Sequence, residues 1–214
     1  VEVVEQYDGT SWTEVGDINT ARWQLAAGGT YTSAIGFGGA TSFPAGSAVT
    51  NSETWNGSSW TEVSDLNQGR RLLAGVGASS TSAIAYAGFN PGTSYALTES
   101  WNGSSWTEVS DLNTLRRDCG STGDATAALA IGGQIHTGTG NTGATESWNG
   151  STWTTLPATL NTDRGAAASS KVSSTSALFF GGDIAPGRIG LTELYNGTSC
   201  SEEADVSLVR RNLG

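Results

Sequence analysis

A short segment with two tryptophans recurs along this chain at an almost constant interval. The sequence Trp-Asn-Gly-Ser-Ser-Trp occupies residues 55–60, returns unchanged at 101–106, and returns with one Ser-to-Thr change at 148–153. Degenerate copies begin at Tyr7 and Tyr195. The first aromatic residues of the copies are 48, 46, 47 and 47 residues apart (7 to 55, 55 to 101, 101 to 148, 148 to 195). A fixed period of this length means that the chain is built from stacked supersecondary units.

Each repeat predicts four short strands. Its second Trp is usually followed by Thr-Glu-Val, an Asp-Leu-Asn turn, one or two arginines, a small-residue stretch such as 72–78, and an apolar run that ends in glycine, such as 82–88. Asn-Gly between two strands favours positive φ at both central residues, which predicts a tight hairpin. Apolar residues lack helical spacing, so we expect no helix. The repeat predicts an all-β propeller with four-stranded blades of about 47 residues.

The repeat resembles the kelch repeat of the galactose-oxidase-type propellers. The diglycine of that motif is matched by Gly38-Gly39, Gly132-Gly133 and Gly181-Gly182, and Ala87-Gly88 differs from it by one residue. Small residues in the inner strands suit crowding near a propeller axis, and outer-strand tryptophans can pack between neighbouring blades. The resemblance assigns structural roles to the last glycine and the outer tryptophan of each unit, which are Gly39, Gly88, Gly133 and Gly182, and Trp12, Trp60, Trp106 and Trp153.

The repeat boundaries predict five blades, four complete and one partial. The complete units span 16–62, 63–108, 109–155 and 156–202. Residues 1–15 form an outer hairpin before them, and residues 203–214 begin a further inner strand. Propellers often complete one blade from both chain ends. Because a bare sheet edge invites association, we expect the natural chain to be longer or a neighbouring segment to cover the gap.

Glutamates and arginines recur at fixed places in the repeat. A glutamate stands two residues before the first aromatic, on the same strand face, at Glu5, Glu53, Glu99, Glu146 and Glu193. Arginines follow the Asp-Leu-Asn turn at Arg22, Arg70, Arg71, Arg116, Arg117, Arg164, Arg210 and Arg211. We expect the two residue types to pair within or between blades as bidentate clamps. A ring of ligand-binding charges is the alternative.

The remaining polar motifs favour structural roles over metal or cofactor binding. Asp17, Asp65 and Asp111 are expected to cap turns through their own backbone, and they are not spaced as a calcium loop. Cys119 and Cys200 share no metal-like spacing, and Cys200 replaces a repeat Trp. The Asn-Gly-Ser/Thr segments match the glycosylation pattern, although hairpin chemistry already explains them; they begin at Asn56, Asn102, Asn149 and Asn196.

Charge and residue content limit the function classes. The formal net charge is −10, and no basic stripe is present, which excludes a nucleic-acid binder. An apolar run long enough to cross a membrane is also missing, as is a basic, apolar leader. A copper site of the galactose oxidase type needs histidine ligands, but His136 is the single histidine. We therefore expect no enzyme and no cofactor, while a paired-carboxylate glycosidase remains an alternative.

Binding is predicted for the loops that follow the diglycines, because these loops differ most between repeats. They span residues 40–52, 89–97, 134–144 and 183–190, and their candidate contact residues are Phe43, Phe89, Tyr95 and His136. The expected partner is a protein or glycan surface, other copies of the chain, or a larger parent chain.

The near-identical repeats also resemble those of structural proteins in tailed phages. That resemblance implies a virion appendage or decoration protein that acts in adhesion or assembly, located in the virion or outside the cell. An extracellular, lectin-like glycan-binding propeller is the first alternative. A carbohydrate-active enzyme on a propeller scaffold is the second.

Overall fold

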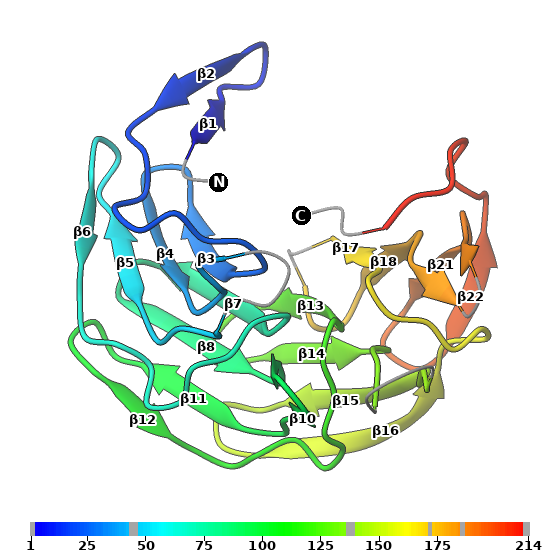
Figure 1. Ribbon diagram of the computed structural model, residues 1–214. Coiled ribbons are helices and arrows are strands. Elements are labelled where there is room, and N and C mark those ends of the chain that lie inside the picture. Colours follow the sequence, from blue (N-terminus) through cyan, green and yellow to red (C-terminus); the bar gives the residue numbers. More distant parts are fainter. Residues whose placement is uncertain (1–2, 43–46, 136–139, 171–172, 185–186, 212–214) are drawn as a thin grey trace.

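The computed structural model describes residues 3–42, 47–135, 140–170, 173–184 and 187–211. These residues form strands, bridges and turns, with no helix among them, so none of them forms a helix that could span a membrane. Four four-stranded sheets, here called blades I to IV, are arranged around a common axis (Figure 1). The all-β propeller predicted from the repeat is confirmed in this arrangement of four blades.

Each blade contains four antiparallel strands that follow one another in chain order from the axis outward. Blade I contains β3 (Ala26–Thr30), β4 (Ser33–Phe37), β5 (Ser52–Trp55) and β6 (Trp60–Glu62). Blade II contains β7 (Ala74–Ser79), β8 (Ser82–Tyr86), β11 (Thr98–Trp101) and β12 (Trp106–Glu108). Blade III contains β13 (Gly120–Gly123), β14 (Ala128–Ile131), β15 (Ala144–Trp148) and β16 (Trp153–Thr159). Blade IV contains β17 (Ala168–Ser169), β18 (Ala177–Phe180), β21 (Thr192–Tyr195) and β22 (Cys200–Glu203).

Three small hairpins lie outside the blades. The loop after β8 forms β9 (Phe89–Asn90) with β10 (Thr93–Ser94), and the loop after β18 forms β19 (Asp183–Ile184) with β20 (Gly187–Arg188). At the N-terminus, β1 (Val4–Tyr7) pairs only with β2 (Trp12–Val15). This hairpin and residues 204–211, which form no strand, lie on the same side of the ring (Figure 1).

The inner strands lie close together because their residues are small. β3 packs beside β7, β7 beside β13, and β13 beside β17. A Cβ added at Gly28 would lie 2.5 Å from the backbone nitrogen of Gly77, and one added at Gly120 would lie 2.6 Å from the ring of Phe179. Side chains larger than hydrogen would therefore push neighbouring blades apart at these points.

Apolar cores lie between neighbouring blades, and the outer tryptophans take part in them. Trp106 of blade II contacts Phe37 of blade I with ring centroids 4.9 Å apart. Trp153 of blade III contacts Tyr86 of blade II at 4.8 Å. Trp60 is half-buried, and Trp12, on the separate hairpin, is 67% exposed. We expected all four tryptophans to pack between blades. Only Trp106 and Trp153, which have a blade before them in the ring, are buried in this way.

The Asn-Gly hairpins differ from the predicted turn. Trp55 pairs with Trp60 across a four-residue loop, and of its Asn-Gly dipeptide only Gly57 has positive φ (94°). The amide oxygen of Asn56 accepts hydrogen bonds from Ser58 N and Ser59 N, both at 2.9 Å. The prediction of positive φ at both residues was wrong, because the asparagine side chain closes the loop as an Asx turn.

The repeat aspartates also act differently from expectation. Asp65 accepts a hydrogen bond from Ser52 N (3.2 Å), and Asp111 accepts one from Thr98 N (3.0 Å). They therefore cap the start of the neighbouring strand and not their own turn. Blade III has Thr159 at this position, and there β16 continues to Thr159, beyond the expected boundary at 155, and pairs with Ala144. β22 ends at Glu203, one residue past the expected boundary at 202.

Candidate functional site: the diglycine face

The diglycines turn the chain out of the second strand of each blade. Gly38 and Gly39 have φ of 66° and 96°, and Gly132 and Gly133 have φ of 63° and 111°. Gly182 has φ 110°, and in blade II Ala87 adopts φ 59° before Gly88 at 113°. Glycine adopts these angles without strain. The described residues of the loops that begin here, with the starts of the inner strands, form one face of the propeller, called the diglycine face below.

The repeated glutamates and arginines meet inside each blade, close to the diglycines. Arg22 Nη2 lies 2.8 Å from Glu53 Oε1, Arg70 Nη2 lies 2.8 Å from Glu99 Oε1, and Arg116 Nη2 lies 2.6 Å from Glu146 Oε1. Arg164 pairs with Glu193 Oε1 through Nη1. All eight side chains are buried. The pairs lie within blades and do not bridge neighbouring blades.

These pairs are not the bidentate clamps that the sequence predicted. In blade II, Arg70 Nη1 donates to Ala87 O (2.9 Å) and Leu97 O (2.7 Å), and only Nη2 reaches the carboxylate. The second oxygen of Glu99 accepts from Asn67 N (2.7 Å) and Asn67 Nδ2 (2.8 Å). The glutamate therefore joins the arginine to the preceding turn, and the arginine holds the strand end at the diglycine. We call this unit the blade clamp.

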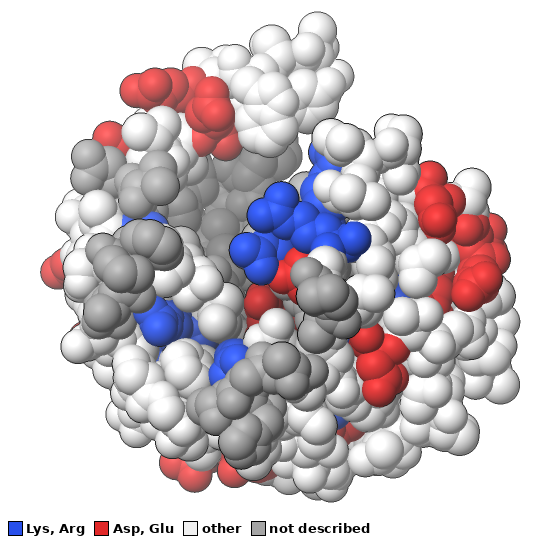
Figure 2. Space-filling model, turned by 45° about the vertical axis from the view of Figure 1, so that its right-hand side comes forward, with Lys and Arg blue, Asp and Glu red and all other residues white. Residues whose placement is uncertain are grey.

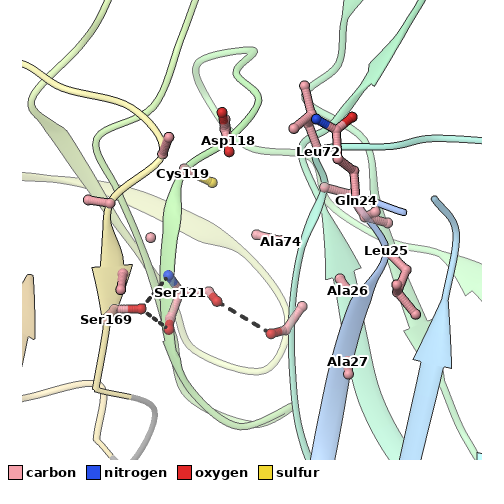
Figure 3. Close-up of a pocket in the computed structure, with 16 residues that line it drawn as sticks. Gln24, Leu25, Ala26, Ala27, Leu72, Ala74, Asp118, Cys119, Ser121 and Ser169 are labelled. Carbon is pink, nitrogen blue, oxygen red and sulfur yellow. Dashed lines mark hydrogen bonds between the residues drawn. The ribbon is translucent and has the colours of Figure 1, made fainter. Parts of the chain in front are cut away.

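A cavity of about 440 Å³ lies on the axis where the inner strands begin. All four blades contribute to its lining, through residues 24–27, 72–75, 118–121 and 166–169 (Figure 3). None of the clamp glutamates lines it. The alternative of a ligand-binding ring made of the repeated charges therefore has no support in this cavity.

Four non-glycine residues in the cavity wall have left-handed backbone. Gln24, Leu72, Asp118 and Ala166 occupy equivalent positions and have φ of 56°, 51°, 56° and 55°. Leu72 N donates to Gln24 O (3.1 Å), Asp118 N to Leu72 O (2.8 Å), and Ala166 N to Asp118 O (2.8 Å). This chain of hydrogen bonds runs from blade to blade and stabilises a conformation that costs about 1–3 kcal/mol per residue. Such strain is common at binding sites.

The polar groups of the cavity come mainly from blades III and IV. Ser169 Oγ accepts from Ser121 N (3.0 Å) and donates to Ser121 O (2.6 Å), as drawn in Figure 3. Burial raises the pKa of the Cys119 thiol to about 11, so this thiol is protonated at neutral pH and is a poor nucleophile. Both cysteines are free. Among the described residues, no group of three or more His, Cys, Asp or Glu side chains could hold a metal ion.

Asp118 lines this cavity, and the pKa of its carboxyl is shifted. Burial and, to a smaller extent, the nearby Asp183 raise the pKa of its carboxyl from 3.8 to about 6, while Arg117 and Arg211 oppose the shift. Because the folded protein keeps this proton when the unfolded chain has lost it, the contribution of Asp118 to stability falls as the pH rises from about 4 to about 6.

We therefore expect Asp118→Asn to stabilise the protein at pH 7.5 by on the order of 2 kcal/mol and to have little effect at pH 4. Urea unfolding of both proteins across this pH range measures the difference. The exposed Asp17→Asn serves as control. A stability difference between Asp118→Asn and the native chain that does not change with pH would contradict the assignment.

Aromatic rings and guanidinium groups gather on the diglycine face beside the cavity. The guanidinium carbon of Arg71 lies 5.1 Å from the Trp23 ring centroid and 5.5 Å from that of Phe89, and Arg117 lies 4.6 Å from the Phe89 centroid. Arg117 is 8% exposed and also bonds to Gln134 Oε1 (3.1 Å). Figure 2 shows basic side chains toward the middle of this hollowed view and most acidic ones toward its rim.

The candidate contact residues predicted from the loops are placed only in part. Phe89 is half-buried under the guanidinium groups, and Tyr95 is half-buried where its carbonyl accepts from Arg116 N (3.0 Å). Phe43 and His136 lie outside the described residues. The sequence analysis did not identify Trp23, and it did not separate the second arginine of Arg70-Arg71 and Arg116-Arg117 from the first. Because the blade clamp uses one arginine per repeat, the presence of a second one could have indicated a different role.

The sheets, their radial order and the axial cavity define a β-propeller. The solved structure titled "Structure of YjhT" is similar to this chain, with a TM-score of 0.78 and 14% sequence identity over 97% of this chain and 78% of that chain. At this identity the likeness concerns the fold alone. No family model matches the chain. No curated protein matches it either.

Proposed function

We propose that this chain is a non-enzymatic binding and structural module, built as a kelch-type propeller of five blades, that binds its partner on the diglycine face. The observation that carries the proposal is that the repeated charged residues are buried inside the blades, whereas the residues that vary between blades lie on one face. The first arginine and the glutamate of each complete blade are buried in a blade clamp. The residues that differ between blades, such as Trp23 and Arg71 at equivalent positions, lie on the diglycine face.

The composition of this face favours a protein partner over a glycan. Aromatic rings and arginines are the residues that dominate binding energy at protein interfaces. The Phe89 ring already contacts two guanidinium groups, which leaves less of it to stack on a sugar. Burial and the nearby Arg71 lower the pKa of Arg117, and Asp118 opposes this shift. A carboxylate on the partner would stabilise this crowded pair of arginines.

We place the module in a virion appendage or decoration, where it acts in adhesion or assembly. The support is the resemblance of its near-identical Trp-Asn-Gly-Ser-Ser-Trp repeats to those of tailed-phage structural proteins. An extracellular glycan-binding propeller is the second candidate. The exposed acidic surface, with a net charge of −10, suits both settings because it favours solubility.

The test compares three variants in binding to intact host-type bacterial cells and to a glycan array. Phe89→Ser and Arg117→Gln change the diglycine face, and Tyr31→Ser is the matched control, because Tyr31 is 68% exposed at the turn between β3 and β4, at the opposite end of blade I. We expect binding to cells that protease treatment of the cells abolishes and that the first two variants weaken at least about tenfold, as for interface hot spots.

Four results would count against the proposal. Binding that survives both diglycine-face substitutions, or that Tyr31→Ser weakens equally, would place the site elsewhere. Glycan-array binding that these substitutions abolish would favour the lectin-like alternative. Hydrolysis of a glycoside substrate by the purified chain would favour the enzyme.

A further inference from the structure

Four equivalent positions in the wall of the axial cavity carry four different side chains. Gln24, Leu72, Asp118 and Ala166 share the left-handed backbone described above, and all of them line the cavity. The hydrogen bonds that join these positions use backbone atoms only, so they do not require any particular side chain there. The paired residues of the blade clamp, in contrast, are the same in every complete blade. Variation at the cavity wall therefore indicates a role other than holding the blades together.

The acceptor atoms of Gln24 and Asp118 have no hydrogen-bond donor among the described residues. Gln24 Oε1 is buried and unpaired in this part of the chain. The Asp118 carboxyl is affected by burial and by nearby charges, and no hydrogen bond from a described residue reaches it. A buried acceptor without a donor costs free energy. Figure 3 shows the two side chains on opposite sides of the cavity, so one ligand that lies between them can serve both.

The hydroxyl groups of the cavity already donate to its own wall. Ser169 Oγ donates to Ser121 O (2.6 Å), and Ser121 Oγ donates to Gly75 O (3.4 Å). The protons of both hydroxyls are therefore used between the inner strands, and only their oxygens face a ligand as further acceptors. Together with Gln24 Oε1 and the Asp118 carboxylate, they make a set of side-chain acceptors. A ligand that fits this cavity must supply hydrogen-bond donors.

The rest of the wall is mainly apolar, and the cavity has the size of a small-molecule site. Leucines and alanines from three blades line it, namely Leu25, Ala26, Leu73, Ala74 and Ala168. Its volume of about 440 Å³ lies in the range of about 300–1,000 Å³ that is usual for ligand pockets, where apolar walls surround a few polar groups that fix orientation. A short hydrocarbon segment therefore suits the middle of the ligand.

We propose that the axial cavity binds a small primary amine that carries a second hydrogen-bond donor, such as an amino alcohol. The ammonium group donates to the Asp118 carboxylate, and such a charge-assisted bond is stronger than a neutral one. The hydrocarbon part lies against the leucines and alanines, and the second donor reaches Gln24 Oε1. This site is separate from the aromatic and arginine cluster around Phe89, and its occupation does not require the protein partner proposed above.

Binding of the amine depends on the charge of Asp118. The charged groups that act on its carboxyl are Asp183, Arg117 and Arg211, and the adjacent Cys119 thiol is protonated at neutral pH. Because the pKa of Asp118 is about 6, the carboxyl is ionised at pH 7.5, whereas about one-tenth of the molecules keep this charge at pH 5. An ammonium group stabilises the ionised form. Affinity is therefore full above about pH 7 and falls as the pH drops through 6.

The test measures binding of 4-amino-1-butanol, n-butylamine and 1,4-butanediol to the purified chain by titration calorimetry. The three probes have the same hydrocarbon segment and differ in their end groups. Asp118→Asn removes the charge from the cavity. Gln24→Leu removes the acceptor and copies the side chain that Leu72 carries on the same backbone. Asp17→Asn, at an exposed aspartate, is the matched control.

We expect 4-amino-1-butanol to bind the native chain about tenfold more weakly at pH 5 than at pH 7.5. Asp118→Asn should weaken its binding at pH 7.5 by about tenfold or more and abolish the pH dependence, and the diol should bind the native chain as weakly. Gln24→Leu should weaken 4-amino-1-butanol by roughly threefold and leave n-butylamine unchanged. Asp17→Asn should behave as the native chain.

The inference is overturned if the amines do not bind at millimolar concentration, if the diol binds as tightly as the amino alcohol, or if Asp118→Asn binds as the native chain does. An equal effect of Gln24→Leu on n-butylamine and 4-amino-1-butanol would overturn the place of the second donor. Phe89 does not line the cavity, so Phe89→Ser should keep amine binding while it weakens binding to cells. Failure of the cavity site and failure of the proposed function are therefore distinguishable.

Discussion

Replacing Glu99 with Gln is expected to lower the free energy of unfolding by about 3–5 kcal/mol, because one charge of a buried pair then remains without its partner. The Arg70 guanidinium has no exposed side-chain surface, so water cannot replace the lost carboxylate. Gln keeps the size and one acceptor, but it cannot neutralise the arginine. Urea unfolding of the native and variant proteins measures the loss.

The matched control for this prediction is Glu108→Gln. Glu108 pairs directly with Glu99 in the ladder between β11 and β12, yet its side chain is exposed. An exposed substitution of this kind changes stability by about 0.5 kcal/mol or less. Equal losses for Glu99→Gln and Glu108→Gln would mean that the blade clamp contributes no more than an ordinary surface charge.

The blade clamp also shows what the repeat can and cannot reveal. Equal recurrence of glutamate and arginine was enough to predict that they pair. It could not reveal the geometry, because the competing partners of Arg70 are the backbone carbonyls of Ala87 and Leu97. Backbone groups are present at every residue and leave no signature in a sequence. The bidentate prediction failed for that reason.

The diglycine face was harder to predict than the fold. Strand number, blade order and the diglycine turns follow from local patterns that repeat four times. The cluster of Trp23, Arg71, Phe89 and Arg117 unites residues from equivalent positions in different blades with one loop residue. Its members are neighbours only once the ring has formed. The sequence does show that one repeat position varies between an aromatic residue and arginine. This variation points to a binding surface only when the structure places the position beside the axial cavity.

Replacing Trp106 with Ala is expected to destabilise the protein by about 3–5 kcal/mol, as is typical for a buried Trp that leaves a cavity. Trp106 is 6% exposed, lies 4.9 Å from the Phe37 ring, and donates its indole proton to Ser52 Oγ. The variant therefore loses packing between blades I and II and removes the donor from the oxygen of the buried Ser52 hydroxyl. Trp106→Phe should recover most of the packing and retain a penalty of about 1–2 kcal/mol for the lost hydrogen bond.

The control for Trp106 is Tyr31→Ala, because Tyr31 is 68% exposed and its carbonyl, which accepts from Trp55 Nε1 (2.9 Å), is kept in the variant. Thermal and urea unfolding of the four proteins should rank them as native chain, Tyr31→Ala, Trp106→Phe and Trp106→Ala, in order of falling stability. Equal losses for Trp106→Phe and Trp106→Ala would assign the stabilisation to the indole hydrogen bond alone. A loss below about 1 kcal/mol for Trp106→Ala, the level of an ordinary substitution, would show that the blades are held together mainly by their inner strands.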